Sequence, residues 1–326
     1  MTDQLFNVPI ISIGKYRRYR CDMVDGDQFS AKEQYEQNND DKLIIESVLH
    51  IPLAIQRYIL HSDQTVRLQA DLNCKLAKMD NDETNFRISS KSRSDLISAE
   101  TRLQLQIYKA KQRTRFTHFV AVNLNELQAK VDNFKKQVIY IQLVDKCLFQ
   151  KPERFHLTLC TLVLLDDYEV ELAKRILGEI PSKVSLDAFR TDGHIEIKNL
   201  EIMNDDPGCV DVLYAKVVDN DAAQALIRFT EELKSQMSNH NLCLESTDKD
   251  YGRVKLHATL MNSKFTLSND NEATESGSNE ERKSFDARKI FNQLKDYNFG
   301  KIQLINKIAI CKRSSFDQTT GYYETV

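Results

Sequence analysis

The chain has 326 residues, of which 41% are hydrophobic and 29% are charged, and its formal net charge is −3 at pH 7. This length suits two domains, and the slightly acidic balance excludes a broadly basic nucleic-acid coat while it leaves room for a local basic groove. The seven cysteines are scattered and show no CxxC spacing, which argues against a zinc site and a disulfide scaffold.

Two further exclusions concern the cellular location. The first residues lack the basic head and apolar core of a signal peptide, and the chain has no apolar run long enough to span a bilayer. We therefore expect a soluble protein of a reducing, intracellular compartment, without a membrane as partner.

Residues 1–41 are predicted to be a flexible N-terminal tail, because residues 22–41 are polar and acidic. An apolar and then basic segment, residues 10–20, precedes that stretch. It fits a docking motif for a partner or a nuclear-import signal, and equally a solvated tail, so the alternatives stay open.

Residues 42–113 read as a small α/β unit. A strand is expected over residues 43–49, and Pro52 suits the first turn of a short helix. The remaining elements of this unit are a helix over residues 65–72, strands near 74–77 and 85–89, and a long helix over 94–111 with Leu96, Ala99, Leu103 and Ile107 facing inward.

Residues 114–326 read as a second domain that opens with a strand at 119–122. Further helices are expected with caps at Asn125 and at Asp166 or Asp167, over 221–238 and over 287–297, and strands over 195–202, 210–217 and 302–311. Residues 204–208 form a turn, and residues 268–278 form a polar surface loop. The domain is predicted to be an internal pseudo-repeat.

Two apolar segments of this second domain carry the same pattern, a histidine and a threonine two residues apart. They are His156-Leu157-Thr158 and His257-Ala258-Thr259. In a strand, residues i and i+2 point to one face, so each segment presents an imidazole beside a hydroxyl. A single motif of this kind is typical of a core histidine, but its duplication predicts that the two faces line one groove.

Such a groove suits acid–base chemistry on a phosphodiester without a metal or another cofactor. One imidazole takes a proton from the attacking oxygen and the other gives a proton to the leaving oxygen, while the threonine hydroxyls bind the phosphate. We assign His257 as general base and His156 as general acid, and an exchange of the two stays open. Arg154 and Lys255 are expected on the same face as substrate-binding cations at the rim, the alternative being solvent-exposed strand entrances.

These motifs resemble the signature of the two-histidine (2H) phosphoesterase superfamily, in which two His-x-[Thr/Ser] strands line a groove between two lobes. The resemblance extends to residues 203–217, 255–262 and 282–288, and it is closest to the A-kinase-anchoring-protein type preceded by a KH domain. It implies an α+β fold, with a KH-like βααββα domain followed by a two-lobed, pseudo-symmetric domain of antiparallel sheets and outer helices. We also expect Tyr214, within the first of these segments, to contact the substrate.

The KH resemblance departs from its family at one place. The loop that carries the pattern GxxG in KH domains falls at His61-Ser62-Asp63-Gln64, where both glycines are missing. Side chains there block the close approach of a phosphate, and Asp63 repels it. Nucleic-acid binding by this unit and a structural or docking role therefore remain alternatives.

The resemblance further implies a nuclear subunit, with the cytoplasm as a second location, of a complex that acts in transcription coactivation and DNA-alkylation repair beside a helicase subunit. The ligand of the groove is expected to be single-stranded nucleic acid or a nucleotide. The alternatives to catalysis are a groove that binds RNA or a nucleotide without cleaving it, and a scaffold that docks through residues 10–20.

Overall fold

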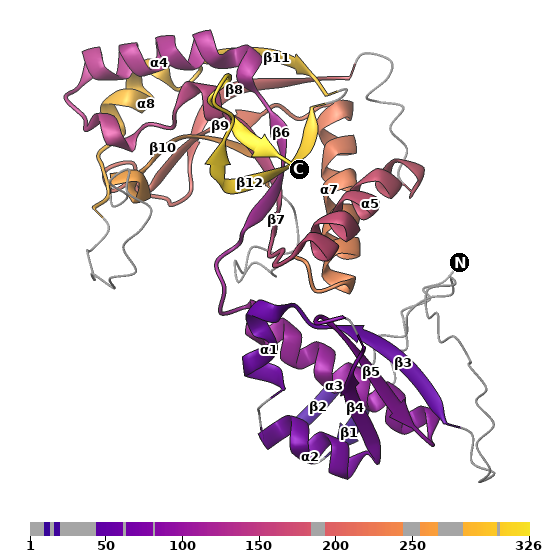
Figure 1. The fold of residues 1–326 in the computed structure, drawn as a ribbon. Helices are drawn as coiled ribbons and strands as arrows, with labels where there is room; N and C mark the ends of the chain where they lie inside the picture. The colour runs from indigo at the N-terminus through magenta and orange to yellow at the C-terminus, as the bar shows by residue number, and fades with distance from the viewer. Residues whose placement is uncertain are drawn as a thin grey trace, which may run out of the picture. The chain divides into compact units, whose positions relative to one another are not determined.

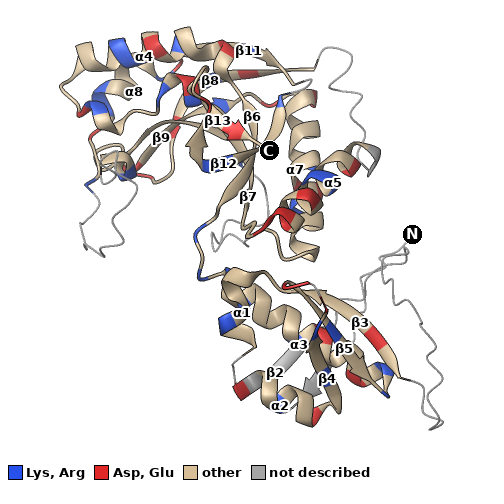
Figure 2. Cartoon of the chain, in the orientation of Figure 1, with Lys and Arg blue, Asp and Glu red and all other residues tan. Residues whose placement is uncertain are grey.

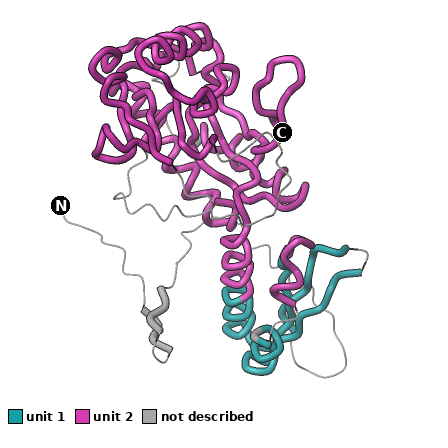
Figure 3. Tube along the Cα trace, turned by 90° about the vertical axis from the view of Figure 1, so that its left-hand side faces the viewer, with its two compact units in different colours: residues 1–50, 63–102 teal, residues 51–62, 103–326 magenta. Residues whose placement is uncertain are grey.

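The computed structural model describes residues 10–13, 16–19, 44–60, 63–80, 82–183, 193–243, 255–266, 283–304 and 307–326. The chain forms two compact units, residues 1–50 with 63–102 and residues 51–62 with 103–326 (Figure 3). Within the predicted tail, β1 (Ile10–Ile13) and β2 (Tyr16–Tyr19) pair as an antiparallel hairpin. Their β-branched and aromatic residues favour strands, which the prediction of a flexible tail did not consider. The predicted loop at 268–278 lies outside the described residues.

The region from residue 44 to 111 has the predicted order of elements, strand–helix–helix–strand–strand–helix. In chain order they are β3 (Ile45–His50), α1 (Leu53–Ile59), α2 (Asp63–Asp71), β4 (Cys74–Lys78), β5 (Asn85–Ser90) and α3 (Arg93–Lys111). The three strands form an antiparallel sheet in the order β3-β5-β4. The predicted inward stripe of α3 is buried, and the KH assignment of this region stays a prediction. Of the degenerate loop, His61 and Ser62 lie outside the described residues, while Asp63 and Gln64 begin α2.

The second unit is built on an eight-stranded antiparallel sheet in the order β11-β8-β9-β10-β7-β6-β12-β13 (Figure 1). The two strands with the His-x-Thr motifs, β7 (His156–Leu162) and β10 (His257–Asn262), are its central pair. The other strands are β6 (His118–Asn123), β8 (His194–Ile202), β9 (Val212–Val217), β11 (Asn298–Gln303), β12 (Ile308–Phe316) and β13 (Tyr323–Thr325). Because β6 pairs with β7 and β9 with β10, each motif strand has a neighbour from its own half, as the predicted pseudo-repeat requires.

Four helices of this unit pack as two pairs. α4 (Gln128–Ile141) lies against α8 (Arg288–Leu294), and α5 (Asp167–Lys183) lies against α7 (Asp221–Asn239) (Figure 1). The core beneath them takes up alternate residues of the sheet, including Val120, Leu157 and Ala258. The helices cover one face of the central strands, so the residues between these positions stay available for a site.

Three boundaries differ from the sequence prediction. Asn125 does not cap its helix with its side chain: it starts a 3₁₀ turn (Asn125–Leu127), and Oδ1 of Asn123 accepts from its backbone N–H. The helix predicted over 287–297 is only seven residues long. The strand predicted over 302–311 is two strands, because β11 pairs with β8 at one end of the sheet and β12 pairs with β6 near the other end. Between them the backbone N–H of Lys307 donates to the carbonyl of Leu304 at 3.2 Å.

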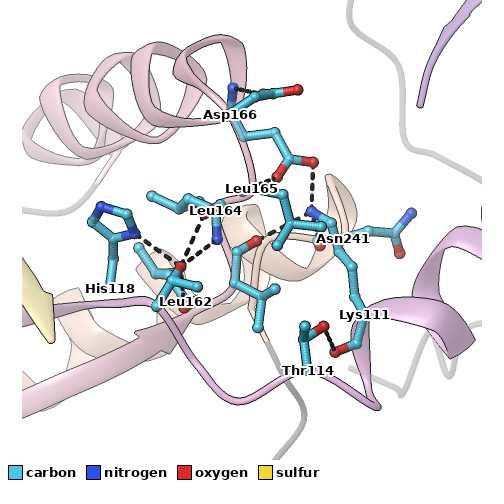
Figure 4. Close-up of polar contacts among 11 residues, drawn as sticks. Lys111, Thr114, His118, Leu162, Leu164, Leu165, Asp166 and Asn241 are labelled. Atoms are coloured by element: carbon cyan, nitrogen blue, oxygen red, sulfur yellow. Dashed lines mark hydrogen bonds and ion pairs between the residues drawn. The ribbon is translucent and has the colours of Figure 1, made fainter. Parts of the chain in front are cut away.

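A buried ion pair supports the loop that follows β7. Nζ of Lys111 lies 2.5 Å from a carboxylate oxygen of Glu169, and both side chains are almost fully buried (Figure 4). The same ammonium group donates to the carbonyl oxygens of Val163 and Asn241, at 3.2 and 3.1 Å. The second carboxylate oxygen of Glu169 accepts from the backbone N–H of Leu165. Every polar group of this pair therefore has a partner, as burial of two charges requires.

Candidate functional site

The two His-x-Thr motifs lie side by side on adjacent strands. Leu157 of β7 pairs with Ala258 of β10. Because the strands are antiparallel, this pairing brings His156 level with Thr259 and Thr158 level with His257. All four side chains are half-buried, while Leu157 and Ala258 between them are fully buried on the other face. The predicted catalytic residues thus gather on one open face of the sheet.

Each motif strand carries a bulge directly after its threonine. On β7 the bulge residue is Leu159, since Cys160 pairs with Val120 and Thr158 with Ala121. On β10 it is Leu260, since Thr259 pairs with Tyr214 and Met261 with Leu213. A bulge bends its strand and increases the local twist, so the repeated bulges turn both motifs in the same way.

The imidazole of His156 is fixed on both nitrogens. Nδ1 lies 2.7 Å from the carbonyl oxygen of Arg154, which can only accept, so Nδ1 carries a proton. Nε2 lies 3.1 Å from the hydroxyl of Thr158, which donates to it when the ring is neutral. Burial lowers the pKa of His156 to about 4, against the effect of the bond to Arg154, and His257 lowers it further. His156 is therefore neutral near pH 7, with Nε2 as its basic atom.

The imidazole of His257 repeats this arrangement in the second half. Its Nδ1 lies 3.0 Å from the carbonyl oxygen of Lys255. The ring meets that of Tyr214 edge to face, with the centroids 5.4 Å apart. Burial lowers the pKa of His257, the bond to the Lys255 carbonyl raises it, and the Lys255 ammonium group lowers it. Both histidines thus hold Nδ1 on a backbone carbonyl, and Nε2 of His156 contacts the Thr158 hydroxyl of its own motif.

The two rim cations lie before their strands and not on the strand face where they were expected. Arg154 ends a 3₁₀ turn (Pro152–Arg154), and its guanidinium carbon is 3.3 Å from the centroid of the Phe316 ring. Lys255 precedes β10, and its ammonium nitrogen is 5.3 Å from the centroid of the Tyr214 ring. Both cations lie just before a strand begins, and the backbone carbonyl of each is directed at Nδ1 of the histidine two positions later.

Tyr214 is placed differently from the substrate contact that was expected. Its side chain is fully buried, because it lies on β9 opposite Thr259 and under the edge of the His257 ring. It therefore supports His257 rather than the substrate in this structure.

An aromatic wall next to His156 was not identified from the sequence. The ring centroids of Phe119 and Tyr323 lie 5.1 and 5.3 Å from that of His156. Phe316 contacts Tyr323 in turn, at 5.4 Å. The sequence predicts Phe119 only as part of a buried strand. No pattern in the C-terminal residues links them to the first motif, because the pairing of β12 with β6 joins distant parts of the chain.

The charge around the site is local. The helices α4 and α5 carry both basic and acidic residues (Figure 2). Next to the second motif, Lys216 and Lys255 both approach Glu201, at 3.6 Å each, around a hollow of about 200 Å³. A larger hollow of about 1120 Å³ lies elsewhere, beside His118 and Arg313. The positive charge near the two motifs therefore comes from a few residues, Arg154, Lys216 and Lys255.

Within the described ranges, no group of three or more His, Cys, Asp or Glu side chains has the arrangement of a metal site. In the same part of the chain, no helix combines the length and apolarity that a membrane crossing needs. The donor set of the motif face is imidazole, hydroxyl and cation, without the carboxylates that Mg²⁺, Ca²⁺ and Mn²⁺ prefer.

Comparison with known proteins gives two results. Residues 116–326 match the family model described as the AKAP7 2′5′ RNA ligase-like domain. Over 249 residues the chain is 32% identical to the activating signal cointegrator 1 complex subunit 1 of Mus musculus, an alignment that covers 72% of this chain and 68% of the mouse protein.

Proposed function

The chain belongs to the family of AKAP7 2′5′ RNA ligase-like domains and to that of activating signal cointegrator 1 complex subunit 1, and from this premise we propose that it is a metal-independent phosphodiesterase. Its substrates are phosphodiesters of single-stranded nucleic acids or nucleotides. The observation that carries the proposal is the pairing of Leu157 with Ala258, which brings both His-x-Thr motifs onto one open face.

The groups on this face supply each part of a phosphodiester cleavage. One Nε2 accepts the proton of the attacking hydroxyl, and the other donates a proton to the leaving oxygen. Thr259 donates a hydrogen bond to a non-bridging oxygen, where negative charge grows in the transition state, and Thr158 does the same once its hydroxyl turns from Nε2 of His156 to the substrate. Arg154, which ends the turn before β7, attracts the phosphate.

The test is turnover by His156→Ala and His257→Ala, in EDTA, on 2′,3′-cyclic nucleotides and on single-stranded RNA and DNA. Each variant should lose on the order of 10²-fold or more in kcat, the usual contribution of a general acid or base. His118→Ala is the matched control, because His118 belongs to the same sheet but faces the larger hollow. Binding of nucleotide without turnover by the wild type would assign the face to ligand binding and not to catalysis.

We also propose that the chain is a nuclear subunit of an activating signal cointegrator complex that takes part in transcription coactivation and DNA-alkylation repair. The support is the name of the mouse relative and the length of the alignment with it. A tagged chain should co-purify with the helicase subunit of that complex from nuclear extract. Deletion of residues 1–20 tests the docking role of the N-terminal segment, since a pull-down that survives the deletion places the contact elsewhere.

A further inference from the structure

Each motif histidine belongs to a closed ring of four contacting residues. The ring of His156 runs through Arg154, Phe316 and Tyr323. Nδ1 of His156 bonds the Arg154 carbonyl, the Arg154 guanidinium stacks on Phe316, Phe316 contacts Tyr323, and Tyr323 meets His156 edge to face. Apart from one cation, this ring is built of aromatic groups, which cover part of the half-buried imidazole.

The ring of His257 runs through Lys255, Glu201 and Tyr214. Nδ1 of His257 bonds the Lys255 carbonyl, and Nζ of Lys255 lies 3.6 Å from Oε1 of Glu201. Glu201 is the register partner of Tyr214 on the neighbouring strand, and Tyr214 meets His257 edge to face. The members of the two rings follow in the same order: first the histidine, then the residue two positions before it, then a third residue, and last a tyrosine. They differ at the third residue, which is Phe316 in one ring and Glu201 in the other.

Glu201 on β8 and Tyr214 on β9 lie opposite each other in the sheet. Oη of Tyr214 and Oε2 of Glu201 are both buried without a well-formed hydrogen bond to the described residues. Burial raises the pKa of Tyr214, and the facing carboxylate raises it further. Burial acts to raise the pKa of Glu201 too, but Tyr214, Lys255 and Lys216 together hold it below its ordinary value. Glu201 is therefore a carboxylate near pH 7, and the Tyr214 hydroxyl keeps its proton.

The charged and titratable groups around His257 come from β7, β8 and β9 and from the residue that precedes β10. They are the ammonium groups of Lys255 and of Lys216, its register partner on β9, the carboxylate of Glu201 on β8, and His156 on β7. The Lys255 ammonium group disfavours an imidazolium at His257. Glu201 forms ion pairs with both Lys255 and Lys216. His156 faces Arg154, Tyr323 and His257, with no such carboxylate among its contacts in the described part of the chain.

We infer that Glu201 is a positioning residue which, through Tyr214 and Lys255, favours the protonated form of His257, so that His257 is the general acid. The aromatic residues Phe316 and Tyr323 in the contact ring of His156 keep His156 neutral, so that it is the general base. This inference rests on the proposed phosphodiesterase function and reverses the order assigned from the sequence. In the step, the O–H bond of the nucleophile breaks, its proton passes to Nε2 of His156 and its oxygen bonds phosphorus. The bond from phosphorus to the leaving oxygen breaks, and that oxygen takes the proton from Nε2 of His257.

The order of the histidines is tested with a leaving group that needs no proton. An oligonucleotide with a 5′-bridging phosphorothiolate releases a thiolate, so it does not depend on a general acid. His257→Ala should lose on the order of 10²-fold on the oxygen ester and regain most of that loss on the sulfur ester, whereas His156→Ala stays slow on both. Recovery of His156→Ala in place of His257→Ala overturns the assignment.

The role of Glu201 is tested with Glu201→Gln, which keeps the volume and removes the charge. It should slow the oxygen ester about threefold, the change that a pKa lowered by about 0.5 unit produces, and leave the sulfur ester unchanged, because the carboxylate acts only through the acid. The control is Glu196→Gln, the same change on the same strand, with Glu196 facing Lys301 in the register. Equal slowing of both esters by Glu201→Gln means a structural role and overturns the inference.

A second readout does not need turnover and so separates this inference from the proposed function. In an NMR titration of the imidazoles, Glu201→Gln should lower the pKa of His257 by about 0.5 unit and leave that of His156 unchanged. An unchanged pKa of His257 overturns the role of Glu201. A wild type that cleaves neither ester refutes the proposed function, while the titration still decides whether Glu201 acts on His257.

Discussion

Leu157 and Ala258 pair across the central strands of the eight-stranded sheet, and this pairing joins the two halves of the candidate site. The two side chains are fully buried on the helix-covered face, directly behind the histidines and threonines. The spacing of the two imidazoles therefore depends on how closely two apolar residues pack on the opposite face.

Enlarging Ala258 should separate the motifs. Ala258→Leu inserts a larger side chain into a position with no exposed surface, which costs about 1–3 kcal/mol by overpacking. We expect a lower unfolding free energy in urea and a loss of kcat that exceeds any change in KM. Leu157→Met is the control, since it conserves volume and should retain both stability and turnover. A less stable Ala258→Leu with full kcat would show that the imidazole spacing does not depend on this pair.

Much of the motif face follows from local sequence. The alternation of His and Thr with apolar residues in two segments predicts strands with both polar groups on one face, and burial of Leu157 and Ala258 agrees with it. The helices of the second unit follow from apolar residues at helical spacing, and the cap at Asp166 is confirmed by its bond to the N–H of Glu169. These features depend only on neighbours within a few positions.

The missed features depend on distant parts of the chain. The bulges at Leu159 and Leu260 exist only relative to their partner strands, and neither residue differs in kind from an ordinary buried leucine. The break between β11 and β12 arises because they pair with different strands, although the sequence from 302 to 311 has an unbroken strand pattern. Tyr323 reaches His156 through such a pairing, so local pattern gave no reason to connect the two.

The pH profile of catalysis should be shifted to the acid side. As the general base, His156 must be deprotonated, and its pKa is about 4. As the general acid, His257 must be protonated, and burial lowers its pKa below the ordinary value of 6.5. kcat/KM should therefore be greatest at mildly acidic pH and fall about tenfold per unit above the pKa of His257. Initial rates on a cyclic nucleotide from pH 4 to 9 measure this. A rate that rises from pH 7 to 8 would contradict it.

Folding stability should also depend on His156. Its pKa is about 4 in the folded chain and 6.5 when unfolded, so the unfolded state binds more protons between these values. The unfolding free energy is therefore full above pH 6.5 and decreases as the pH falls towards 4, by about 3 kcal/mol from this group. Urea denaturation at a series of pH values gives the slope. His156→Gln cannot titrate and should have a shallower slope, and an identical slope would assign the loss to other groups.

Removing one member of the buried ion pair should destabilise the second unit strongly. Lys111→Met leaves the Glu169 carboxylate without its cation and the carbonyls of Val163 and Asn241 without their donor. Breaking a buried pair in this way costs about 3–5 kcal/mol. Lys109→Met is the matched control, because Lys109 is exposed two residues away on the same helix and should change stability little. Equal stability of the two variants, measured by thermal unfolding, would show that the pair adds nothing.

The turn that carries Gly321 should affect substrate binding through Arg154. Gly321 has φ +70°, and an added Cβ would lie 2.9 Å from Cγ of Glu153, so Gly321→Ala meets both backbone strain and a contact with a flexible side chain. The expected cost is about 1–2 kcal/mol. Nε of Arg154 donates to the carbonyl of Gly321 at 3.3 Å, so the guanidinium should move and KM should rise more than kcat falls.

The matched control for this prediction is Gly178→Ala in α5. An added Cβ at Gly178 meets nothing within 4 Å, and alanine stabilises a helix interior by about 1 kcal/mol relative to glycine. The two variants should therefore shift the melting temperature in opposite directions, and only Gly321→Ala should change KM. If KM is unchanged while Gly321→Ala is destabilised as expected, the position of Arg154 does not control the binding of the phosphate.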